Sequence, residues 1–379
     1  MLFSPLRLRG LVLPNRVVIS PMCTYSATDG MANDWHFAHL AKFALGGAGT
    51  VFVEATAVEA DGGLGRGDVG LWSDGHVPPL RRIADFCKEY GAVPAIQLGH
   101  AGRKGSSQRP WIGSGPLTDA DREYGDIPWQ TVSAGSVPVN DRWPTPEPLS
   151  LARMDSMRES WRNATRRALQ AGFEIVEIHM AHGYLLHQFL SPVTNTRSDA
   201  YGGSLAKRMC YPLEIAQIVR QTWPQDRPVF VRISAVDEWW SIEDSITLAQ
   251  ELKVIGIDVI DCSTGGLGRS PEALRVARGY GFQAPFAEAV KHGANITTMA
   301  VGLILDPALG NEIVSSNRAD LVAIGRGALV DPNWALHARR ALQEHHPPFE
   351  KWPRQYGVWL GQREGVLEKI RKDSKVSES

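Results

Sequence analysis

Eight short runs of apolar, largely β-branched residues recur along this chain, and they constrain its fold more than any other feature. Amphipathic stretches of helical period separate the runs, which comprise residues 17–20, 51–54, 93–98, 175–179, 229–233, 258–262, 296–299 and 321–324. Their hydrophobicity is mostly continuous rather than alternating, as is typical of strands buried on both faces of a parallel sheet. Eight strand–helix units favour closure into one α/β barrel, a (β/α)8 TIM barrel, over an open sheet.

The intervening stretches carry helix start and stop signals. Asn33 or Asp34 can cap a first helix that stops at Gly46-Gly47. The other expected helices cover residues 81–88, 157–171, 213–222, 241–255, 287–291, 308–315 and 333–343. This alternation of strand and helix predicts βαβ units with parallel strands.

One connection is anomalous in length and composition. Residues 99–150 are rich in Gly, Pro and Trp and have no helical period, and a loop of that length is usually functional. We expect it to form a cap over the barrel mouth after the third strand, with room for a hairpin. Residues 1–365 then form one barrel domain, and the charged tail, residues 366–379, is expected to be disordered.

Composition narrows the class of protein. The formal net charge is −1 over 379 residues, so no overall field attracts nucleic acid or an anionic membrane. The start lacks the basic-then-apolar run of a signal peptide and no apolar stretch could span a bilayer, so we expect a cytoplasmic protein. The four cysteines, Cys23, Cys87, Cys210 and Cys262, are too scattered for a zinc or iron–sulfur site.

The strand ends carry the candidate functional residues, because barrel enzymes place their chemistry at the carboxyl ends of the strands. In chain order these residues are Pro21-Met22-Cys23 with Tyr25, Ala55, Gln97, His179 with His182 and Tyr184, Arg232, Ser263, Gly302, and Gly325-Arg326. Polar and redox-capable groups thus converge on one rim from eight separate segments. Such convergence is harder to obtain by chance than any single motif.

The segment from His179 to Tyr184 admits three interpretations. Both histidines can be structural, or they can be metal ligands, although the rim offers no obvious carboxylate or thiolate at metal spacing. Alternatively, the N–H groups of His179 and His182 can both point at one oxygen and stabilise charge that develops on it. Tyr184 then stands close enough to deliver a proton as general acid.

Arg232 and the last two strand ends are the remaining signals. A buried arginine is nearly always paired, so Arg232 either makes an ion pair with Glu54 or Glu177, or lies beneath a ring that becomes anionic. Glycines at Gly302 and around Arg326 place backbone N–H groups and a guanidinium where barrels bind phosphate. No Walker loop is present, which disfavours a P-loop domain.

Longer motifs extend these signals. They are Ser20-Pro21-Met22-Cys23-Thr24-Tyr25, Val53-Glu54-Ala55-Thr56-Ala57-Val58, Gln97-Leu98-Gly99-His100-Ala101-Gly102-Arg103-Lys104, the segment from His179 to Tyr184, His187-Gln188-Phe189-Leu190-Ser191-Pro192, Tyr201-Gly202-Gly203-Ser204 and Ser263-Thr264-Gly265-Gly266. On these residues the chain resembles the old yellow enzymes, specifically the thermophilic-like branch that includes bacterial xenobiotic reductases. The resemblance covers nearly the whole chain, from Pro14 to about Trp359.

This resemblance implies noncovalently bound FMN that is reduced by NADPH, with NADH as an alternative reductant. The implied cofactor-binding residues are Ser20, Pro21, Met22, Cys23, Ala55, Gln97, Arg232, Gly302, Gly325 and Arg326. Among them, Cys23 would tune the potential of the ring, Arg232 would stabilise its reduced anion, and Arg326 would hold the phosphate. The flavin carries the difficult chemistry, and the protein supplies orientation and electrostatics.

The same resemblance implies an ene-reductase that acts on alkenes conjugated to a carbonyl or nitro group. His179 and His182 would hold the substrate oxygen, flavin N5 would give hydride to the β-carbon, and Tyr184 would protonate the α-carbon. Tyr25 would help to shape the pocket. The expected partners are small activated alkenes and a second copy of the chain, in a homodimer or higher homo-oligomer, with neither nucleic acid nor membrane.

Two departures from the family pattern stand out. Some relatives carry an arginine near the C-terminus that enters the neighbouring subunit's site. The matching stretch here, residues 355–359, lacks it, and Tyr356 or Trp359 can take its place. Ala300 stands where one relative has a tryptophan, which predicts a roomier pocket.

Three rival functions remain open at this stage. A dienoyl-CoA reductase or amine dehydrogenase of the same superfamily would need an iron–sulfur cluster and further domains. A cofactor-free lyase or isomerase would use His179 and Tyr184 as an acid–base pair. A flavin-binding module without turnover is the third.

Overall fold

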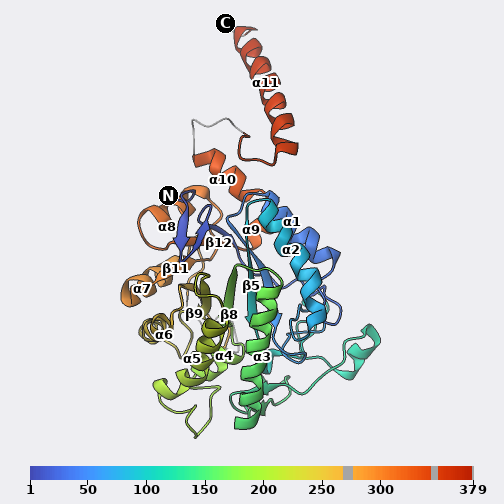
Figure 1. The fold of residues 1–379 in the computed structure, drawn as a ribbon, viewed down its shortest axis with the longest axis vertical. Helices are drawn as coiled ribbons and strands as arrows, with labels where there is room; N and C mark the ends of the chain where they lie inside the picture. Colours follow the sequence, from blue (N-terminus) through green and yellow to red (C-terminus); the bar gives the residue numbers. More distant parts are fainter. Residues whose placement is uncertain (268–275, 343–348, 378–379) are drawn as a thin grey trace.

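The computed structural model describes residues 1–267, 276–342 and 349–377, and its centre is a closed parallel barrel (Figure 1). The barrel strands are β3 Val17–Ile19, β4 Thr50–Ala57, β5 Val93–Gly99, β8 Ile175–Met180, β9 Val229–Ser234, β10 Val259–Ser263, β11 Thr297–Ala300 and β12 Leu321–Ile324. They pair in that order, and β12 closes back onto β3. All eight predicted runs coincide with these strands, so the predicted TIM barrel is confirmed.

Helices alternate with the strands and surround them. The principal ones are α1 Asp34–Leu45, α2 Val77–Glu89, α3 Leu151–Gln170, α5 Leu205–Thr222, α6 Ile242–Ile255, α7 Ala284–Ala294, α8 Pro307–Ser315 and α10 Trp334–Leu342, with two short helices, α4 Leu185–Leu190 and α9 Arg326–Val330. Each predicted helix overlaps one of them. Asn33 is the N-cap of α1, as predicted, and residue 343, the predicted end of the last helix, lies outside the described residues.

Several helices begin earlier than the sequence indicated. In α2, prolines occupy the first turn, where a missing N–H needs no partner, so the helix starts at Val77 rather than at residue 81. In α3, Ser150 accepts a hydrogen bond from the Arg153 N–H and caps a helix that starts six residues before the prediction. Helix α5 contains Pro212 and continues on its N-terminal side to Leu205.

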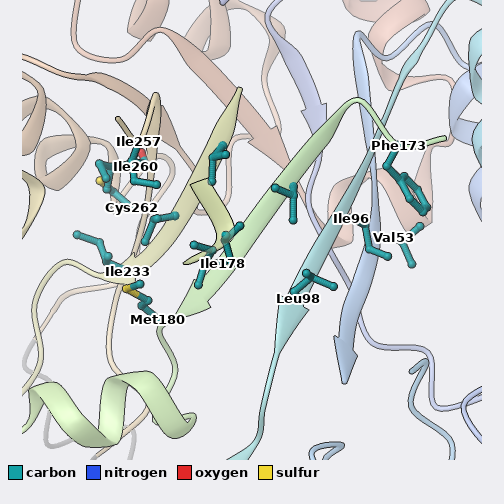
Figure 2. Close-up of a cluster of buried hydrophobic side chains, with 14 of the residues drawn as sticks. Val53, Ile96, Leu98, Phe173, Ile178, Met180, Ile233, Ile257, Ile260 and Cys262 are labelled. Carbon is teal, nitrogen blue, oxygen red and sulfur yellow. The ribbon is translucent and has the colours of Figure 1, made fainter. Parts of the chain in front are cut away.

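Side chains of the barrel strands alternate between two buried layers. The outer layer packs against the helices, and Figure 2 shows members of it, including Val53, Ile96 and Ile178, on neighbouring strands. The inner layer fills the barrel near the N-terminal ends of its strands. Its residues are Val18, Phe52, Val93, Ala95, Ile175, Phe230, Val259, Met299, Leu321 and Ala323. Because both faces of each strand are buried, the runs are continuously apolar.

An antiparallel hairpin covers one end of this inner layer. Strand β1 (Leu6–Leu8) pairs with β2 (Leu11–Leu13), and Leu8 and Leu13 join the inner cluster. The sequence analysis did not identify this hairpin. At the opposite end, the next inward-facing positions of five strands are polar, and the candidate functional residues gather there. These polar residues are Ser20, Gln97, Glu177, Arg232 and Asp261.

A register shift in β4 decides which of its residues faces that polar end. Val53 pairs with Ile96, and the next pairing joins Ala55 to Gln97, so Glu54 is one residue more than β5 has. A bulge of this kind re-aims the side chains that follow it. The Glu54 carboxylate accepts hydrogen bonds from the N–H and hydroxyl of Thr24 at 3.0 and 2.7 Å.

The excursion of residues 99–150 holds only short elements: the 3-10 helices η2 (Gly102–Lys104) and η3 (Asp119–Tyr124), and strands β6 (Val132–Ser133) and β7 (Glu147–Pro148). The hairpin expected here is only partly present. Strands β6 and β7 pair in parallel, while the antiparallel contact is a single bridge between Ser107 and Pro116.

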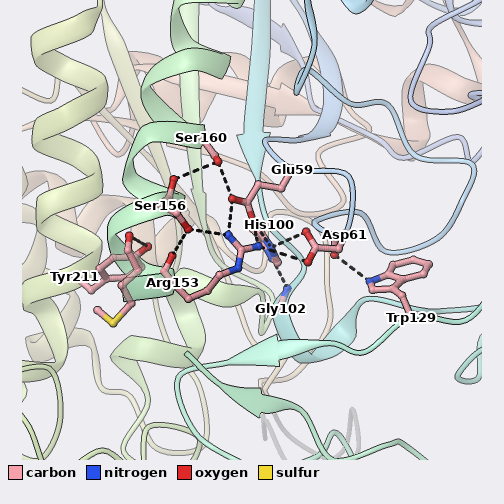
Figure 3. A network of polar contacts seen from close by, with 10 residues as sticks. Glu59, Asp61, His100, Gly102, Trp129, Arg153, Ser156, Ser160 and Tyr211 are labelled. Carbon is pink, nitrogen blue, oxygen red and sulfur yellow. Dashed lines mark hydrogen bonds and ion pairs between the residues drawn. The ribbon is translucent and has the colours of Figure 1, made fainter. Parts of the chain in front are cut away.

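A buried polar network ties this excursion to the barrel and to α3 (Figure 3). Arg153 donates two hydrogen bonds to the Glu59 carboxylate, at 2.8 and 2.5 Å, and Ser160 donates a third at 2.6 Å. Trp129 of the excursion donates from Nε1 to the Asp61 carbonyl at 3.0 Å. Burial alone would raise the pKa of Glu59, but hydrogen bonds from His100 and Arg153 outweigh it and lower the pKa to about 2.

Glu59→Gln is therefore expected to lower the free energy of unfolding at pH 7 by about 1–3 kcal/mol, because it leaves buried donors unpaired. The folded-state pKa of Glu59 lies below its usual 4.5. Its contribution is therefore complete above pH 4.5 and is lost as the pH falls towards 2. Urea unfolding across this range should show a shallower loss of stability in the variant than in the wild type.

The control is Glu159→Gln, which removes an exposed i,i+3 partner of Arg162 on the same helix. It should change stability by less than about 0.5 kcal/mol, because exposed ion pairs contribute little. Equal effects of the two substitutions would contradict the role given to the buried network.

Helix α11 spans Arg354–Ser377 and extends away from the barrel, past α10 (Figure 1), so residues 366–377 of the tail that the sequence predicts to be disordered lie in a helix. Residues 378–379 lie outside the described part. None of the described helices is long and apolar enough to cross a membrane.

Candidate active site

Most of the predicted site residues line two cavities at the polar end of the barrel. The larger cavity, about 250 Å³, is lined by Ser20, Pro21, Met22, Arg232, Ser263, Gly302, Gly325 and Arg326, together with Phe282 and Gln283. A smaller one is lined by Cys23, Ala55 and Tyr184, together with Asp68. Residues that are distant in sequence thus meet as the strand-end argument predicts.

Two hydrogen-bonded pairs form the floor beneath this region. Gln97 donates from Nε2 to Glu177 Oε1 at 2.8 Å. Arg232 Nε lies 3.0 Å from Asp261 Oδ2, and Arg232 Nη1 donates to Ser20 Oγ at 3.3 Å. The proposed ion-pair partners Glu54 and Glu177 were therefore wrong, because Asp261 lies directly beside Arg232 in the β9–β10 register.

The floor contains two acidic side chains, Glu177 and Asp261, and one basic side chain, Arg232. Burial, and then the charge of Asp261, raises the pKa of Glu177 well above its usual value. Burial also raises the pKa of Asp261, while Arg232 lowers it. A neutral Glu177 beside an Asp261–Arg232 ion pair gives a floor without net charge.

The two histidines of the β8 loop are neighbours. Their ring centroids lie 5.1 Å apart, and His179 Nε2 is 3.3 Å from His182 Nδ1. The Ala181 N–H donates to His179 Nδ1 at 3.1 Å, and His182 Nε2 lies 2.7 Å from Ser263 Oγ. Burial, followed by the charge of Arg232, lowers the pKa of both rings well below the usual value, so both imidazoles are neutral at pH 7.

The backbone of His182 adopts a strained conformation that its neighbours hold in place. Its φ of +58° lies in the left-handed region, which non-glycine residues seldom occupy. The His182 N–H donates to Ser234 Oγ at 2.9 Å, and its carbonyl accepts from Lys104 Nζ at 2.7 Å. A Cβ on Gly266 would lie only 2.3 Å from His182 Cα, so glycine is needed there. Strain of this kind is typical of functional sites.

Tyr184 completes this corner of the site. It is the N-cap residue of α4, and its ring centroid lies 4.5 Å from that of His179. Burial, and then the charges near Cys23 and Tyr25, raises the pKa of Tyr184 well above 10.0, so its hydroxyl stays protonated.

Tyr25 and Cys23 lie on the loop that follows β3. The Tyr25 ring meets Trp111 of the 99–150 excursion edge-on at 6.0 Å, so the excursion reaches the site. Burial raises the pKa values of Tyr25 and of the Cys23 thiol, which is therefore not a thiolate. The charge of the buried Asp68 carboxyl raises both pKa values further.

The described residues contain two groups that could ligate a metal, and one of them shares Cys23 and Asp68 with the smaller cavity. One comprises Cys23, Glu54 and Asp68, and the other Glu59, Asp61 and His100. Neither includes His179 or His182, so the metal-ligand interpretation of these two histidines gains no support.

Several site residues were missed from the sequence. Asp261 could have been found, because an acid at an inward position of an apolar strand must be paired, as for Glu177. Lys104 lies in a quoted motif, but nothing in the sequence indicates that it reaches the His182 carbonyl. Phe282 and Gln283 precede a helix far from any strand end, and no local signal distinguishes them.

A barrel whose polar side chains gather on one rim is typical of an enzyme, and comparison with known proteins gives the family. The chain belongs to the NADH:flavin oxidoreductase / NADH oxidase family, whose sequence model matches residues 1–345. It is 41% identical over 347 residues to an NADPH dehydrogenase of Geobacillus sp. (strain WCH70), covering 90% of this chain and 94% of that protein. An NADPH dehydrogenase of Listeria monocytogenes serotype 4a (strain HCC23) is 39% identical, with 90% and 95% covered.

Solved structures share the fold. Morphinone reductase superposes with a TM-score of 0.73 at 24% identity, covering 93% of this chain and 92% of the other. A 2-naphthoyl-CoA reductase complex gives a TM-score of 0.77 at 24% identity, with 88% of this chain covered. The chain spans about half (51%) of that longer protein.

These findings confirm the resemblance to the old yellow enzymes. The chain is an oxidoreductase that uses FMN and a nicotinamide cofactor.

Proposed function

We propose that this protein is an ene-reductase that reduces alkenes conjugated to a carbonyl or nitro group. The observation that carries the proposal is the convergence of two neutral imidazoles and a protonated phenol beside the cofactor region. Such a set can hold a carbonyl oxygen and supply a proton, but offers no nucleophile.

The larger cavity fits FMN. It runs from Ser20 and Arg232 on the barrel floor to Gly325 and Arg326 at the rim, so one ligand can touch both groups. Gly302 has a φ of +115°, and a Cβ there would lie 3.1 Å from the Phe282 ring, which a side chain would crowd. Backbone N–H groups and Arg326 would hold the phosphate, while Gln97, Cys23 and Ala55 would contact the ring.

FMN bound there supplies the redox chemistry, accepting hydride from NAD(P)H and passing hydride to the β-carbon of the alkene. His179 and His182 bind the substrate oxygen and withdraw electron density from the alkene, which makes the β-carbon electrophilic. The Tyr184 hydroxyl gives its proton to the α-carbon. Arg232, paired with Asp261, would supply a positive charge beside the bound cofactor. The contact of Tyr25 with Trp111 brings the 99–150 excursion to the site.

Arg326→Ala is expected to weaken FMN binding about 10- to 100-fold, the typical effect of losing a charged hydrogen bond to phosphate. Quenching of FMN fluorescence during titration of the apoprotein measures the dissociation constant. Arg318→Ala is the control, because Arg318 pairs with Glu288 and Glu312 away from the cavity. An unchanged dissociation constant in Arg326→Ala would place the phosphate elsewhere.

The direct test of the function is a visible spectrum of the purified protein, titrated first with NADPH and then with cyclohexenone. Bleaching by NADPH and recovery of the yellow colour with the enone support an ene-reductase. A protein that stays colourless when FMN is added favours the cofactor-free lyase or isomerase. Bleaching without recovery by any enone or nitroalkene would leave a different flavin reaction or a binding module.

A homodimer or higher homo-oligomer formed through the tail belongs to this proposal. Tyr356 and Trp359 are exposed on α11, at 48% and 69%, which supports a partner surface there. The mass measured by light scattering, before and after deletion of residues 354–379, tests it.

A further inference from the structure

The protons of the two site histidines can be placed from their hydrogen-bond partners. His179 Nδ1 accepts the Ala181 N–H at 3.1 Å, so the proton of this neutral ring is on Nε2. That Nε2–H faces His182 Nδ1 at 3.3 Å. The orientation of His179 is therefore fixed by its own loop.

His182 has two available tautomers. In one, His182 Nε2–H donates to Ser263 Oγ, and Nδ1 accepts from His179. In the other, the Ser263 hydroxyl donates to Nε2, and the proton of His182 is on Nδ1. The 3.3 Å contact between His179 Nε2 and His182 Nδ1 is a donor–acceptor pair only in the first tautomer. The second presents two N–H groups side by side, which fits an oxygen that accepts from both.

We propose that the Ser263 hydroxyl is a positioning group that donates to His182 Nε2 and so directs the His182 proton to Nδ1, beside His179 Nε2–H. This inference rests on the proposed donor-pair role of the two histidines. Ser263 acts through His182 and is not itself a donor to the substrate.

The surroundings of Ser263 allow this direction of donation. Its side chain is buried at 5% exposure, and in the described part of the chain His182 is the hydrogen-bonding partner of its hydroxyl. Ser263 also lines the larger cavity, where its oxygen can accept a hydrogen bond while its proton goes to His182. A hydroxyl can both donate and accept, so the bond can reverse when a substrate oxygen arrives.

The strand register places Ser263 where this contact is possible. Ser263 ends β10 and lies opposite Ser234 of β9. Ser234 Oγ accepts the His182 backbone N–H and donates to the Gly265 carbonyl at 2.6 Å. Ser234 thus fixes the backbone of His182, and Ser263 fixes its ring. A hydrogen bond to the far nitrogen commonly sets a histidine's tautomer.

The experiment uses the FMN-loaded protein with ¹⁵N-labelled histidine and bound 4-nitrophenol, whose oxygen stands in for the substrate oxygen. Two-bond ¹H–¹⁵N spectra report which nitrogen of His182 is protonated, with assignments from a His182→Gln variant. In the wild type we expect the proton on Nδ1. In Ser263→Ala we expect it wholly or partly on Nε2, with the dissociation constant of 4-nitrophenol raised about tenfold.

Two further variants separate positioning from mere packing. Ser263→Thr keeps the hydroxyl and should restore both the tautomer and the affinity. Ser234→Ala removes the backbone contact but leaves the ring partner, so the His182 proton should stay on Nδ1. FMN content of each variant verifies that the barrel is folded.

A His182 proton on Nε2 in the wild-type complex would overturn the inference, and this measurement needs no Ser263 variant. So would a Ser263→Ala protein with the wild-type tautomer and affinity. If the wild type reduces enones and binds 4-nitrophenol while either result holds, only the Ser263 role fails. If the wild type neither binds the phenol nor reduces any activated alkene, the proposed function fails with it.

Discussion

Replacing Tyr184 with phenylalanine is expected to slow alkene reduction by about 10²–10⁴-fold, the usual contribution of a positioned general acid. The phenyl ring keeps its place against His179, 4.5 Å away between centroids, so binding of the substrate should change little. Reduction of FMN by NADPH needs no proton from this hydroxyl and should change by less than about threefold. Stopped-flow spectra of the two half-reactions measure each rate separately.

The control for this substitution is Tyr211→Phe. Tyr211 is fully buried, and its hydroxyl donates to the Met154 carbonyl at 3.4 Å, on the outside of the barrel. Its loss should leave both half-reactions unchanged. Equal slowing of the two half-reactions in Tyr184→Phe would contradict the proton-donor role. In the wild type, the raised pKa of Tyr184 keeps its hydroxyl protonated, so this group should cause no loss of alkene reduction up to pH 10.

His179→Ala is expected to lower the rate of enone reduction by about 10²–10³-fold, as is typical when one donor to a developing oxyanion is lost. The physical reason is that His182 Nδ1–H alone then polarises the carbonyl. Affinity for phenols should fall as well, while FMN stays bound, because Arg326 and the glycine loops line the larger cavity and His179 does not. Enone kinetics and 4-nitrophenol titrations measure the two effects.

His39→Ala is the matched control for losing a buried imidazole. His39 packs between Trp35 and Phe43 on α1, away from the site. Enone reduction should be unaffected there, apart from any loss of stability. Wild-type enone kinetics in His179→Ala would defeat the donor-pair role.

Much of the barrel could be predicted because the sequence of each strand by itself shows that the strand is buried. A strand buried on both faces must be apolar throughout, so Val229 to Ile233 is recognisable without knowledge of its neighbours. Helix ends were less predictable, since prolines such as Pro78 and Pro79 can start a helix as well as stop one. The β1–β2 hairpin was missed because its strands are three residues each, with Arg9 at a positive φ in the turn.

The site could be predicted in membership but not in its pairings. Strand-end position identified His179, Arg232 and Gly302, because the barrel brings all strand ends to one rim. The partner of Arg232 depends on the register between β9 and β10, which the sequence does not reveal, so Asp261 is recognisable as an acid that needs a partner but not as the partner of Arg232.

The extra residue in β4, Glu54, changes which of the following side chains point into the barrel. Below it, Phe52 follows the alternation that fills the core; above it, Ala55 rather than Glu54 comes to lie opposite Gln97. Without it, strict alternation would point an ionisable carboxyl at the cofactor region, where a methyl group now lies. Residues before the bulge pack in the core and residues after it face the site, so either group can be substituted without changing the other. Deleting one residue at the bulge would turn the side chains that follow it to the opposite face of the strand.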